Sequence, residues 1–557
     1  MKRVTLLLFA MSVSWAAESG YMDHNALSRH LDGLAAAHPG LIGLSELGVS
    51  AGGRVIYAVT VAEGAATRGA EGAATRGTGD RPALLVVGGI LGGDLASTRI
   101  CLDLIEKLVQ RSAEIDSVTS LLARSVFYVV PGLNPDAAEL LFHHPVQSSE
   151  VNSRPVDDDG DGLIDEDGGE DLNDDGLITC MRVPDPQGSW IADAGDPELM
   201  RKADFSRGER GRYRLFVEGV DDDGDGLFNE DPAGGIDLNR NFSARHPLFE
   251  AASGPHPFSE SETRALADFC FSHTNIAAIF TFSHNSNLFT PWEGVEGERI
   301  EPRMPIEKVH PDDLPYYRSI SDRFRRITRW ETGPESLPGG GGLSEWAYYH
   351  FGRWSLSAPA WWPPSGAAEQ SNGIEEDPIA EQRVLLRWLK KSSADAGYLR
   401  WSQIEHPDFP GIPVEVGGLR PGVPFNPAPD SLALYSERHT DFLIDLAARL
   451  PRLEIEAAGV EALAERLYRV TLHLRNSGHL PVNTAVGANL AWAPGLRVSI
   501  SVGENQSLAS GRKVQLLDRF EERAKVSWVI RAPRRSAVSV KAGSPLCGFL
   551  VRELELK

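Results

Sequence analysis

The segment Gly-Ile-Asp-Leu-Asn-Arg-Asn-Phe at residues 235–242 decides the fold, together with two other segments. These are Pro-Gly-Leu-Asn-Pro-Asp at residues 131–136 and Gly-Gly-Leu-Ser-Glu-Trp-Ala-Tyr at residues 341–348. Apolar stretches with alternating strand-like and helix-like periodicity surround them. A chain in which strands alternate with helices is typical of an α/β sheet covered by helices.

Strands and helices are predicted on both sides of these segments. Strands are predicted at 41–47, 55–61, 83–87, 126–131 and 277–282, and helices at 23–38, 98–110, 260–273 and 311–330. The turn Ser-Ala-Gly-Gly at 50–53 separates the first two strands. Residues 63–80 contain Glu-Gly-Ala-Ala-Thr-Arg-Gly twice, with no large apolar side chain, and are interpreted as a surface loop insertion.

A second pattern begins near residue 453. Short strand-like runs at 468–474, 497–502, 525–531 and 536–541 alternate with Gly, Pro and Asn turns, which is typical of a β-sandwich. We therefore expect an α/β domain over residues 18–450, with an insertion at about 150–232, and a C-terminal β-sandwich domain over 451–557. A chain of 557 residues with 42% hydrophobic content is long enough for both.

The amino terminus has the features of a secretory signal. Lys2 and Arg3 precede an apolar run from residue 4 to 13, and small residues follow up to Ala17. The sequence therefore predicts a signal peptide over 1–17 and an exported protein, periplasmic or extracellular. No later run approaches the roughly 18 apolar residues of a membrane span. The four cysteines, at 101, 180, 270 and 547, are too few for a disulfide scaffold, although one or two bridges remain open.

The acidity of the chain is local. Its net charge is −23, but residues 157–175 contain eleven acids and residues 221–231 contain six, with no Lys or Arg in either segment. No basic stripe is apparent that would meet phosphate groups, so nucleic acid is not expected as a partner.

The same segments have the spacing of calcium loops, with carboxylates at alternate positions and a glycine after the third. Three loops show it, and their candidate ligands are Asp157, Asp159, Asp161 and Asp165, then Asp171, Asn173 and Asp175, then Asp221, Asp223, Asp225 and Asn229. An acid at the twelfth position is absent from each loop, so they differ from standard EF-hands. A solvated acidic insertion is the alternative, but three occurrences of one spacing favour structural calcium binding.

The three segments quoted first resemble the P-x-x-N-P-D, G-V-D-L-N-R-N-F and G-G-x-x-D-W-x-Y segments of the zinc carboxypeptidases, the carboxypeptidase A-like metallopeptidases. The resemblance extends over residues 21–395 and implies a mixed sheet flanked by helices. In this family two histidines and a glutamate hold zinc, a position stays open for water, and another glutamate is the general base. The peptides whose carboxyl ends such enzymes bind are the partners that the resemblance implies.

Several of the implied metal and base positions are substituted. Where the family has its first two zinc ligands, in H-x-x-E, the chain has Leu91 and Asp94. Leucine offers no lone pair, and aspartate is one methylene shorter than glutamate. His284 is the candidate for the third ligand, although ungapped counting from Pro291 reaches Phe282. Ungapped counting from residue 341 places Pro359 at the general-base position, and proline cannot accept a proton.

The implied clamp for a peptide carboxylate is retained. Asn239 and Arg240 match it, and Arg182 is the candidate for the arginine that polarises the substrate carbonyl. A guanidinium fork with an amide suits a planar carboxylate; the alternative is that Asn239 and Arg240 only stabilise their loop.

Three hypotheses follow. The first is a non-catalytic relative that binds peptide C-termini. The second is a metallocarboxypeptidase that uses Asp94, His284 and an unidentified third group for zinc. The third is a structural calcium-binding exported protein with a vestigial cleft.

Overall fold

The computed structural model describes residues 20–65, 78–157, 160–224, 226–229, 231–289, 292, 308–330, 333, 340–362, 380–391 and 397–557. The predicted signal peptide at 1–17, most of the duplicated segment at 66–77, and the candidate calcium ligands Asp159 and Asp225 lie outside the described residues.

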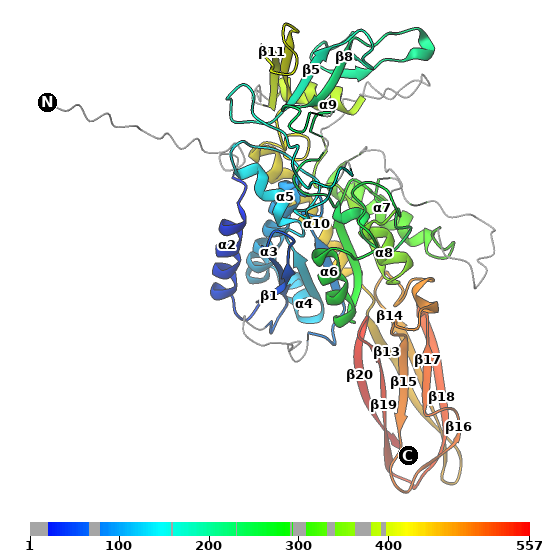
Figure 1. The fold of residues 1–557 in the computed structure, drawn as a ribbon. Coiled ribbons are helices and arrows are strands. Elements are labelled where there is room, and N and C mark those ends of the chain that lie inside the picture. Colours follow the sequence, from blue (N-terminus) through cyan, green and yellow to red (C-terminus); the bar gives the residue numbers. More distant parts are fainter. Residues whose placement is uncertain are drawn as a thin grey trace, which may run out of the picture.

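A six-stranded mixed sheet forms the centre of the α/β region, in the order β1-β2-β4-β3-β9-β10 (Figure 1). Its strands are β1 (Ile42–Val49), β2 (Val55–Val61), β3 (Ala83–Val87), β4 (Val126–Val130), β9 (Ile276–Phe282) and β10 (Trp354–Ala358). β1, β2 and β4 pair antiparallel, whereas β4, β3, β9 and β10 run parallel. The central strands are buried along their whole length, as continuous apolar runs require, and the predicted mixed α/β sheet is confirmed.

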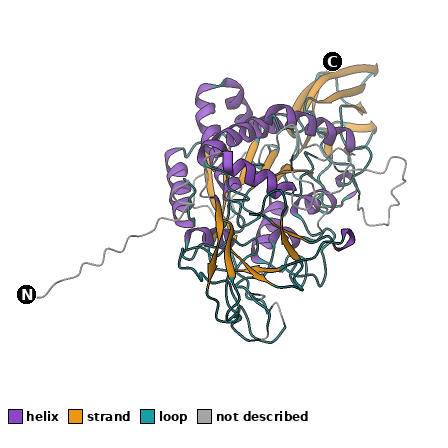
Figure 2. Cartoon of the chain, turned by 90° about the horizontal axis from the view of Figure 1, so that it is seen from above, coloured by secondary structure: helices purple, strands orange, loops and turns teal. Residues whose placement is uncertain are grey.

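Helices flank this sheet, as Figure 2 shows from above. They are α2 (His24–Ala37), α3 (Leu95–Glu114), α4 (Asp116–Arg124), α5 (Pro135–Glu139), α6 (Ser261–Ser272), α7 (Leu314–Thr328), α8 (Leu343–Tyr349), α9 (Ala380–Lys391) and α10 (Pro429–Ala448). Short 3-10 helices lie at η1 (Leu140–Phe142), η2 (Phe205–Arg207), η3 (Leu238–Arg240) and η5 (Gly487–Asn489). α10 packs against α3 and α7, so a helix from beyond the predicted resemblance completes one layer.

A second sheet lies above the first in Figure 1, and the sequence did not predict it. Its order is β11-β12-β5-β8-β6-β7, with β5 (Cys180–Pro184), β6 (Trp190–Ala192), β7 (Met200–Lys202), β8 (Tyr213–Val217), β11 (Tyr398–Ile404) and β12 (Val414–Leu419). We interpreted residues 150–232 as a loop insertion only. The pairing of β12 with β5 joins segments more than 200 residues apart, which local patterns cannot reveal.

The C-terminal region is a β-sandwich that projects away from the α/β region (Figure 1). One sheet has the order β13-β14-β18-β16 and the other β17-β15-β19-β20. The strands are β13 (Leu453–Ala464), β14 (Leu467–Asn476), β15 (Leu496–Ser501), β16 (Ser507–Ser510), β17 (Val514–Leu517), β18 (Arg523–Arg531), β19 (Ser536–Ser544) and β20 (Gly548–Leu556). Buried and exposed residues alternate along β14 and β15, and the predicted sandwich is confirmed.

One hydrophobic core connects the two regions. Residues of the central sheet and of the sandwich belong to the same buried cluster, and the indole of Trp354 donates to the carbonyl of Pro481 at 3.0 Å. All four cysteines are free thiols, and Cys101, Cys270 and Cys547 are buried. Within the described ranges, no helix is long and apolar enough to span a bilayer.

Candidate functional site

Three parallel strands end side by side at one edge of the central sheet. β9 lies between β3 and β10, with Val87 opposite Thr281 and Phe282 opposite Ala358. Leu91 and Asp94 follow the end of β3. His284 follows the end of β9, and Pro359 follows the end of β10. Open α/β sheets bind ligands beyond the carboxyl ends of their strands. The structure therefore brings the substituted zinc and base positions to the edge where a site is expected.

Asp94 caps α3. Its Oδ1 accepts a hydrogen bond from the backbone N–H of Ser97 at 2.9 Å, and the residue is only 4% exposed. Burial raises the pKa of this carboxyl to about 7, despite hydrogen bonds from Ser97 and Ala96 that favour the charged form. Leu91 is buried as well. The hydrogen bond to Ser97 fixes the Asp94 carboxyl as the N-cap of α3, so one of its oxygens is already engaged by the helix.

His284 and Phe282 have different surroundings. Phe282, the last residue of β9, is fully buried and contacts the rings of Phe280 and His439, so it belongs to the core. His284 lies two residues beyond the strand, where its ring packs edge-on against Phe425 with centroids 5.3 Å apart. Burial lowers the pKa of His284 to about 4, so its imidazole is neutral at physiological pH.

Pro359 directly follows β10 and is buried. The carbonyls on either side of it are occupied: Ala358 accepts from the N–H of Ser283 at 3.0 Å, and Ala360 is 3.0 Å from Nε2 of His439. Residues 354–362 contain no Asp or Glu. His439 is a neighbour that the sequence did not suggest, and burial lowers its pKa to about 4.

The clamp residues lie next to these strand ends. Asn239 and Arg240 are in η3, whose N-cap Asp237 accepts from the N–H of Asn239 at 2.8 Å. The Asn239 amide donates to Oγ of Ser283 at 3.2 Å and accepts from the N–H of Leu343 at 3.2 Å. Ser283 is the neighbour of His284, so the clamp and the third ligand position come together.

Arg240 forms one ion pair and leaves one donor unused. Its Nη2 donates to Oε2 of Glu250 at 2.6 Å, and the Glu250 side chain is 63% exposed. Its Nε is buried and has no hydrogen-bond partner among the described residues. Buried guanidinium nitrogens are normally paired, so a buried Nε without a partner among the described residues is an exception.

Arg182 lies in the second sheet and is held there by its own partners. Its Nε donates to Oε2 of Glu415 at 2.8 Å, and its guanidinium stacks on Trp401, 4.4 Å from the ring centroid. It also lies 5.2 Å from the ring of Tyr213. These contacts all belong to strands β5, β8, β11 and β12, and no described contact joins Arg182 to Asn239 or Arg240.

The segment before α10 covers the strand ends, and it was not among the elements predicted from the sequence. The Asn426 amide donates to the carbonyls of Gly93 and Gly422, both at 2.7 Å, and accepts from the N–H of Ala96 at 2.9 Å. The ring of Phe425 reaches Gly93 and His284. The turn that contains Leu91 and Asp94 is therefore held in place by a segment more than 320 residues later in the chain.

The residues present at this edge do not fit a zinc site. Leu91 and Pro359 have no donor atom, Asp94 caps a helix, and His284 packs between aromatic rings. Throughout the described part of the chain, which excludes the loop carboxylates Asp159 and Asp225, no three His, Cys, Asp or Glu side chains lie close enough together to hold a metal ion.

The acidic loops fold as a reciprocal pair. The N–H of Asn229 donates to Oδ2 of Asp167 at 2.9 Å, and the N–H of Asp165 donates to Oδ2 of Asp231 at 3.1 Å. Asp167 and Asp231 also form an antiparallel bridge. The ninth position of each loop thus binds the eleventh of the other. Asp167 is 1% exposed, and its Oδ1 has no partner among the described residues.

The first acid of each loop folds its own backbone. Asp157 Oδ1 accepts from Gly160 N–H, Asp171 Oδ2 from Gly176 N–H and Asp221 Oδ1 from Gly224 N–H, each at 2.7 Å. Asp161, Asn173 and Asp175 accept further backbone N–H groups within their loops. Asp223 is exposed. The loops therefore share one conformation as well as one spacing.

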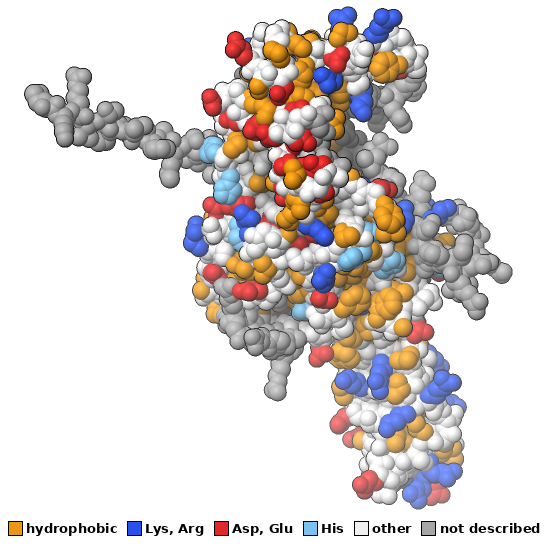
Figure 3. Space-filling model, viewed as in Figure 1, with side chains coloured by type: hydrophobic (Ala, Val, Ile, Leu, Met, Phe, Trp, Pro, Cys, Tyr) orange, Lys and Arg blue, Asp and Glu red, His pale blue; other side chains and the backbone are white. Residues whose placement is uncertain are grey.

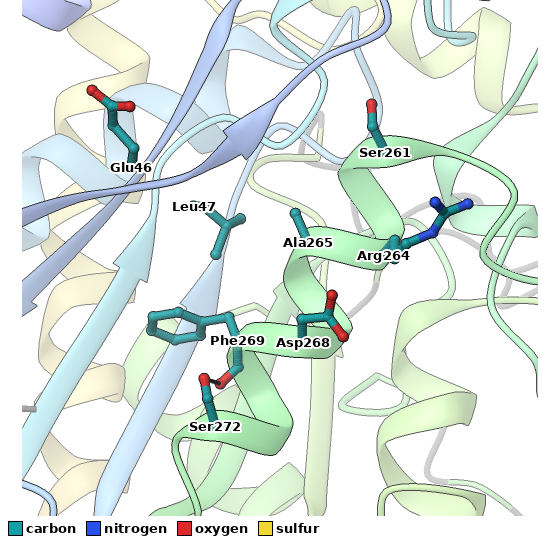
Figure 4. A pocket seen from close by; sticks show the side chains of 8 residues that line it. All are labelled: Glu46, Leu47, Ser261, Arg264, Ala265, Asp268, Phe269 and Ser272. Carbon is teal, nitrogen blue, oxygen red and sulfur yellow. Dashed lines mark hydrogen bonds between the residues drawn. The ribbon is translucent and has the colours of Figure 1, made fainter. Parts of the chain in front are cut away.

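A surface hollow of about 500 Å³ lies elsewhere, between β1 and α6 (Figure 4). Its lining includes Glu46 and Leu47 from β1 and Arg264 and Asp268 from α6. It contains none of the predicted site residues.

Comparisons with known proteins agree with this architecture. The family model "Zinc carboxypeptidase" matches residues 27–173 and 210–358, and a domain of unknown function matches 452–555. Carboxypeptidase B of Astacus astacus is 23% identical over 276 residues, which are 49% of this chain and 65% of that protein, so the chain spans less than two thirds of that relative.

Two solved structures are similar at low identity. Carboxypeptidase A from Helicoverpa armigera is 14% identical over 68% of this chain and 74% of its own, with a TM-score of 0.37. Bovine thrombin-activatable fibrinolysis inhibitor is 13% identical over 77% of this chain and 97% of its own, with a TM-score of 0.38. The family model covers more than half of the chain, in the regions that build the central sheet and its site. The chain therefore belongs to the zinc carboxypeptidase family.

Proposed function

We propose that this protein is an exported, non-catalytic member of its family that binds the carboxyl ends of peptides through Asn239 and Arg240. The observation that carries the proposal is the buried Nε of Arg240, which has no partner among the described residues, beside strand ends where the described side chains provide no complete zinc site or general base. A binding site needs only the carboxylate clamp, whereas hydrolysis also needs a polarised water and a proton acceptor.

The absence of catalysis is argued from chemistry at three positions. Leu91 cannot coordinate a metal, Pro359 cannot accept a proton, and Asp94 is engaged at a helix N-terminus. Each missing ligand removes a coordination bond and its orienting neighbours, so zinc affinity should be far below that of a complete site.

Binding is argued from Arg240 and its exposed partner. A peptide carboxylate that replaces Glu250 could accept from both Nη2 and Nε, in the bidentate geometry that guanidinium groups favour. Asn239 fixes η3 against Ser283, which holds the clamp in place before a ligand arrives. Glu250 acts in this scheme as an exchangeable occupant of the clamp.

The experiment is a calorimetric titration of the mature protein with a tripeptide that has a free carboxylate. Arg240→Ala should weaken binding at least tenfold, because the bidentate contact is lost, and the amidated tripeptide should bind equally weakly. Glu250→Gln should strengthen binding, because it frees Nη2. Arg264→Ala on α6 is the matched control and should leave affinity unchanged. Equal affinity for free and amidated peptides would exclude the clamp.

Hydrolysis through a non-standard zinc site is the alternative. Near-stoichiometric, tightly bound zinc by elemental analysis, with peptide cleavage that His284→Ala abolishes, would replace the binding proposal. A protein that neither cleaves nor binds peptides would leave the third hypothesis, a structural protein with a vestigial cleft.

We also infer that the acidic loops bind calcium in a structural role. The reciprocal pairing of Asp165 with Asp231 and of Asn229 with Asp167 supports this, because it packs two dense sets of carboxylates against each other. Cations between such carboxylates would remove their mutual repulsion. The Oδ1 of buried Asp167, which has no partner among the described residues, is a further oxygen at this junction.

A further inference from the structure

Charge divides this chain between its two regions. The whole chain has a net charge of −23, yet residues 452–557 contain sixteen Lys and Arg against ten Asp and Glu. The sandwich is therefore a basic body on an acidic protein. No basic stripe is apparent in the sequence, because the basic residues of the sandwich come together only in the folded chain. In Figure 3, Lys and Arg side chains are scattered along the projecting sandwich down to its far end.

Four arginines gather at that far end. Arg466 lies in the turn between β13 and β14, and Arg531, Arg534 and Arg535 lie at the end of β18 and in the turn that follows. The two turns are adjacent, because the N–H of Ala532 donates to the carbonyl of Arg466 at 2.9 Å. All four side chains are exposed, and none forms an ion pair with any described residue.

Basic residues continue from this end along the outer face of one sheet. The outward positions of β18 are Arg523, Lys525, Ser527, Val529 and Arg531, because the residues between them point inward. On β14, Arg475 is opposite Arg523 and His473 is opposite Lys525. Arg523 pairs with Glu456 of β13 at 3.3 Å, and Arg475 has Glu454 opposite it on β13, whereas Lys525 and Arg531 form no ion pair with any described residue. The positive charge of this face that is open to an external anion therefore lies toward the far end.

We propose that these residues form a docking surface for an acidic polysaccharide. The surface, here called the cationic track, consists of Arg466, Arg534, Arg535, Arg531, Lys525 and Arg475. The distance along β18 from residue 531 to residue 523 is roughly 27 Å at about 3.4 Å per residue. Carboxylate or sulfate groups repeated along a polymer would pair with successive guanidinium groups, and the hydroxyl of Ser527 would add a neutral donor between them.

The shape of the track favours a polymer over a bilayer or a folded protein. A flat bilayer can contact the end of the sandwich or the face of its sheet, whereas a flexible chain can follow both. Protein interfaces are typically centred on aromatic and apolar side chains, and the outward positions of the track contain only Val529 of that kind. The anchoring of an exported protein to an acidic polymer would not involve the peptide clamp, which lies in the other region.

The test uses heparin as the probe and the mature chain from residue 18. Binding is measured by calorimetry at 50 and 300 mM NaCl. The variant Arg466→Asn, Arg534→Ser, Arg535→Asn removes three charges; Asn is chosen because Arg466 and Arg535 have positive φ angles of 61° and 64°. We expect tight binding at low salt, at least tenfold weaker binding at high salt, and at least tenfold weaker binding of the variant.

The matched control removes three charges from the other sheet, as Arg497→Ser, Lys541→Ser, Arg552→Ser, and should change affinity less than threefold. Equal losses in both variants would mean that net charge alone attracts heparin, which overturns the track. The proposal also fails if heparin does not bind at low salt.

Binding to vesicles of phosphatidylglycerol but not to heparin would assign the track to a membrane. The protein could also self-associate without binding heparin, and the variant with Arg466→Asn, Arg534→Ser and Arg535→Asn could abolish this self-association. That result would assign the track to the acidic loops of a second copy. Thermal unfolding of each variant checks that the sandwich remains folded.

Discussion

Asp94, at a position that the family resemblance predicts for a zinc ligand, is a buried helix cap. Its raised pKa of about 7 has a direct consequence for stability. Because the folded pKa exceeds the unfolded value, the contribution of the group is present below about pH 4 and is lost as pH rises through 7. Asp94→Asn retains a capping oxygen without a charge.

We therefore expect Asp94→Asn to gain stability relative to the wild type by about 3 kcal/mol between pH 5 and pH 8. Urea unfolding of both proteins at the two pH values measures the difference. The matched control, Asp103→Asn in the same helix, should show no comparable gain. A gap that stays constant with pH would show that Asp94 is ionised in the folded protein, as a metal ligand is.

Two of the acidic loops contact each other, so the coupling between their calcium sites can be tested. Position nine of each loop donates to position eleven of the other, so the occupancy of one loop should influence the other. Asp221→Ala removes the first position of the loop that begins at residue 221, whereas Asp222→Ala removes an exposed carboxylate at an intervening position and is the control.

We expect Asp221→Ala to lose bound calcium and also to weaken the remaining loops by about fivefold, within the usual range of coupling between sites. Native mass spectrometry and calcium titration measure both quantities. Asp222→Ala should keep the full calcium content. Loss of one ion with unchanged affinity of the others would show that the loops are independent.

Asp313 is one residue that connects the α/β region with the sandwich. It precedes α7 and is fully buried. It accepts hydrogen bonds from the N–H of Ala485 and the hydroxyl of Tyr348, and it pairs with Arg519 at 3.2 Å. One carboxylate thus connects the α/β region to the sandwich. Its neighbour Asp312 also contacts Arg519, but its side chain is 65% exposed.

We expect Asp313→Ala to destabilise the protein by about 3–5 kcal/mol, because it leaves buried donors and a cation unpaired. Asp312→Ala should cost less than about 0.5 kcal/mol, as exposed pairs do. Differential scanning calorimetry measures both. A separate unfolding transition of the sandwich in Asp313→Ala, with cleavage near residues 449–453 in limited proteolysis, would identify the weakened junction.

Local patterns were sufficient for five of the six strands of the central sheet, whereas β10 was not among the predicted strands. Strands 55–61 and 83–87 were predicted with the bounds that the structure has, because continuous apolar runs between turn residues are visible within a few positions. The sequence also predicts that the side chains of Leu91 and Pro359 cannot act as a metal ligand or a base, because this depends only on which atoms a side chain contains.

The sequence by itself determined the family architecture, the β-sandwich and the loss of donor atoms at two positions, since these depend on local periodicity and residue chemistry. Only the tertiary structure decided that Asp94 caps a helix, that Asn426 and Phe425 cover it, that Arg182 stacks on Trp401 in a second sheet, and that arginines from two turns meet at one end. Each of these depends on contacts between segments distant in the chain or on burial, which changes the pKa of a group without changing its identity.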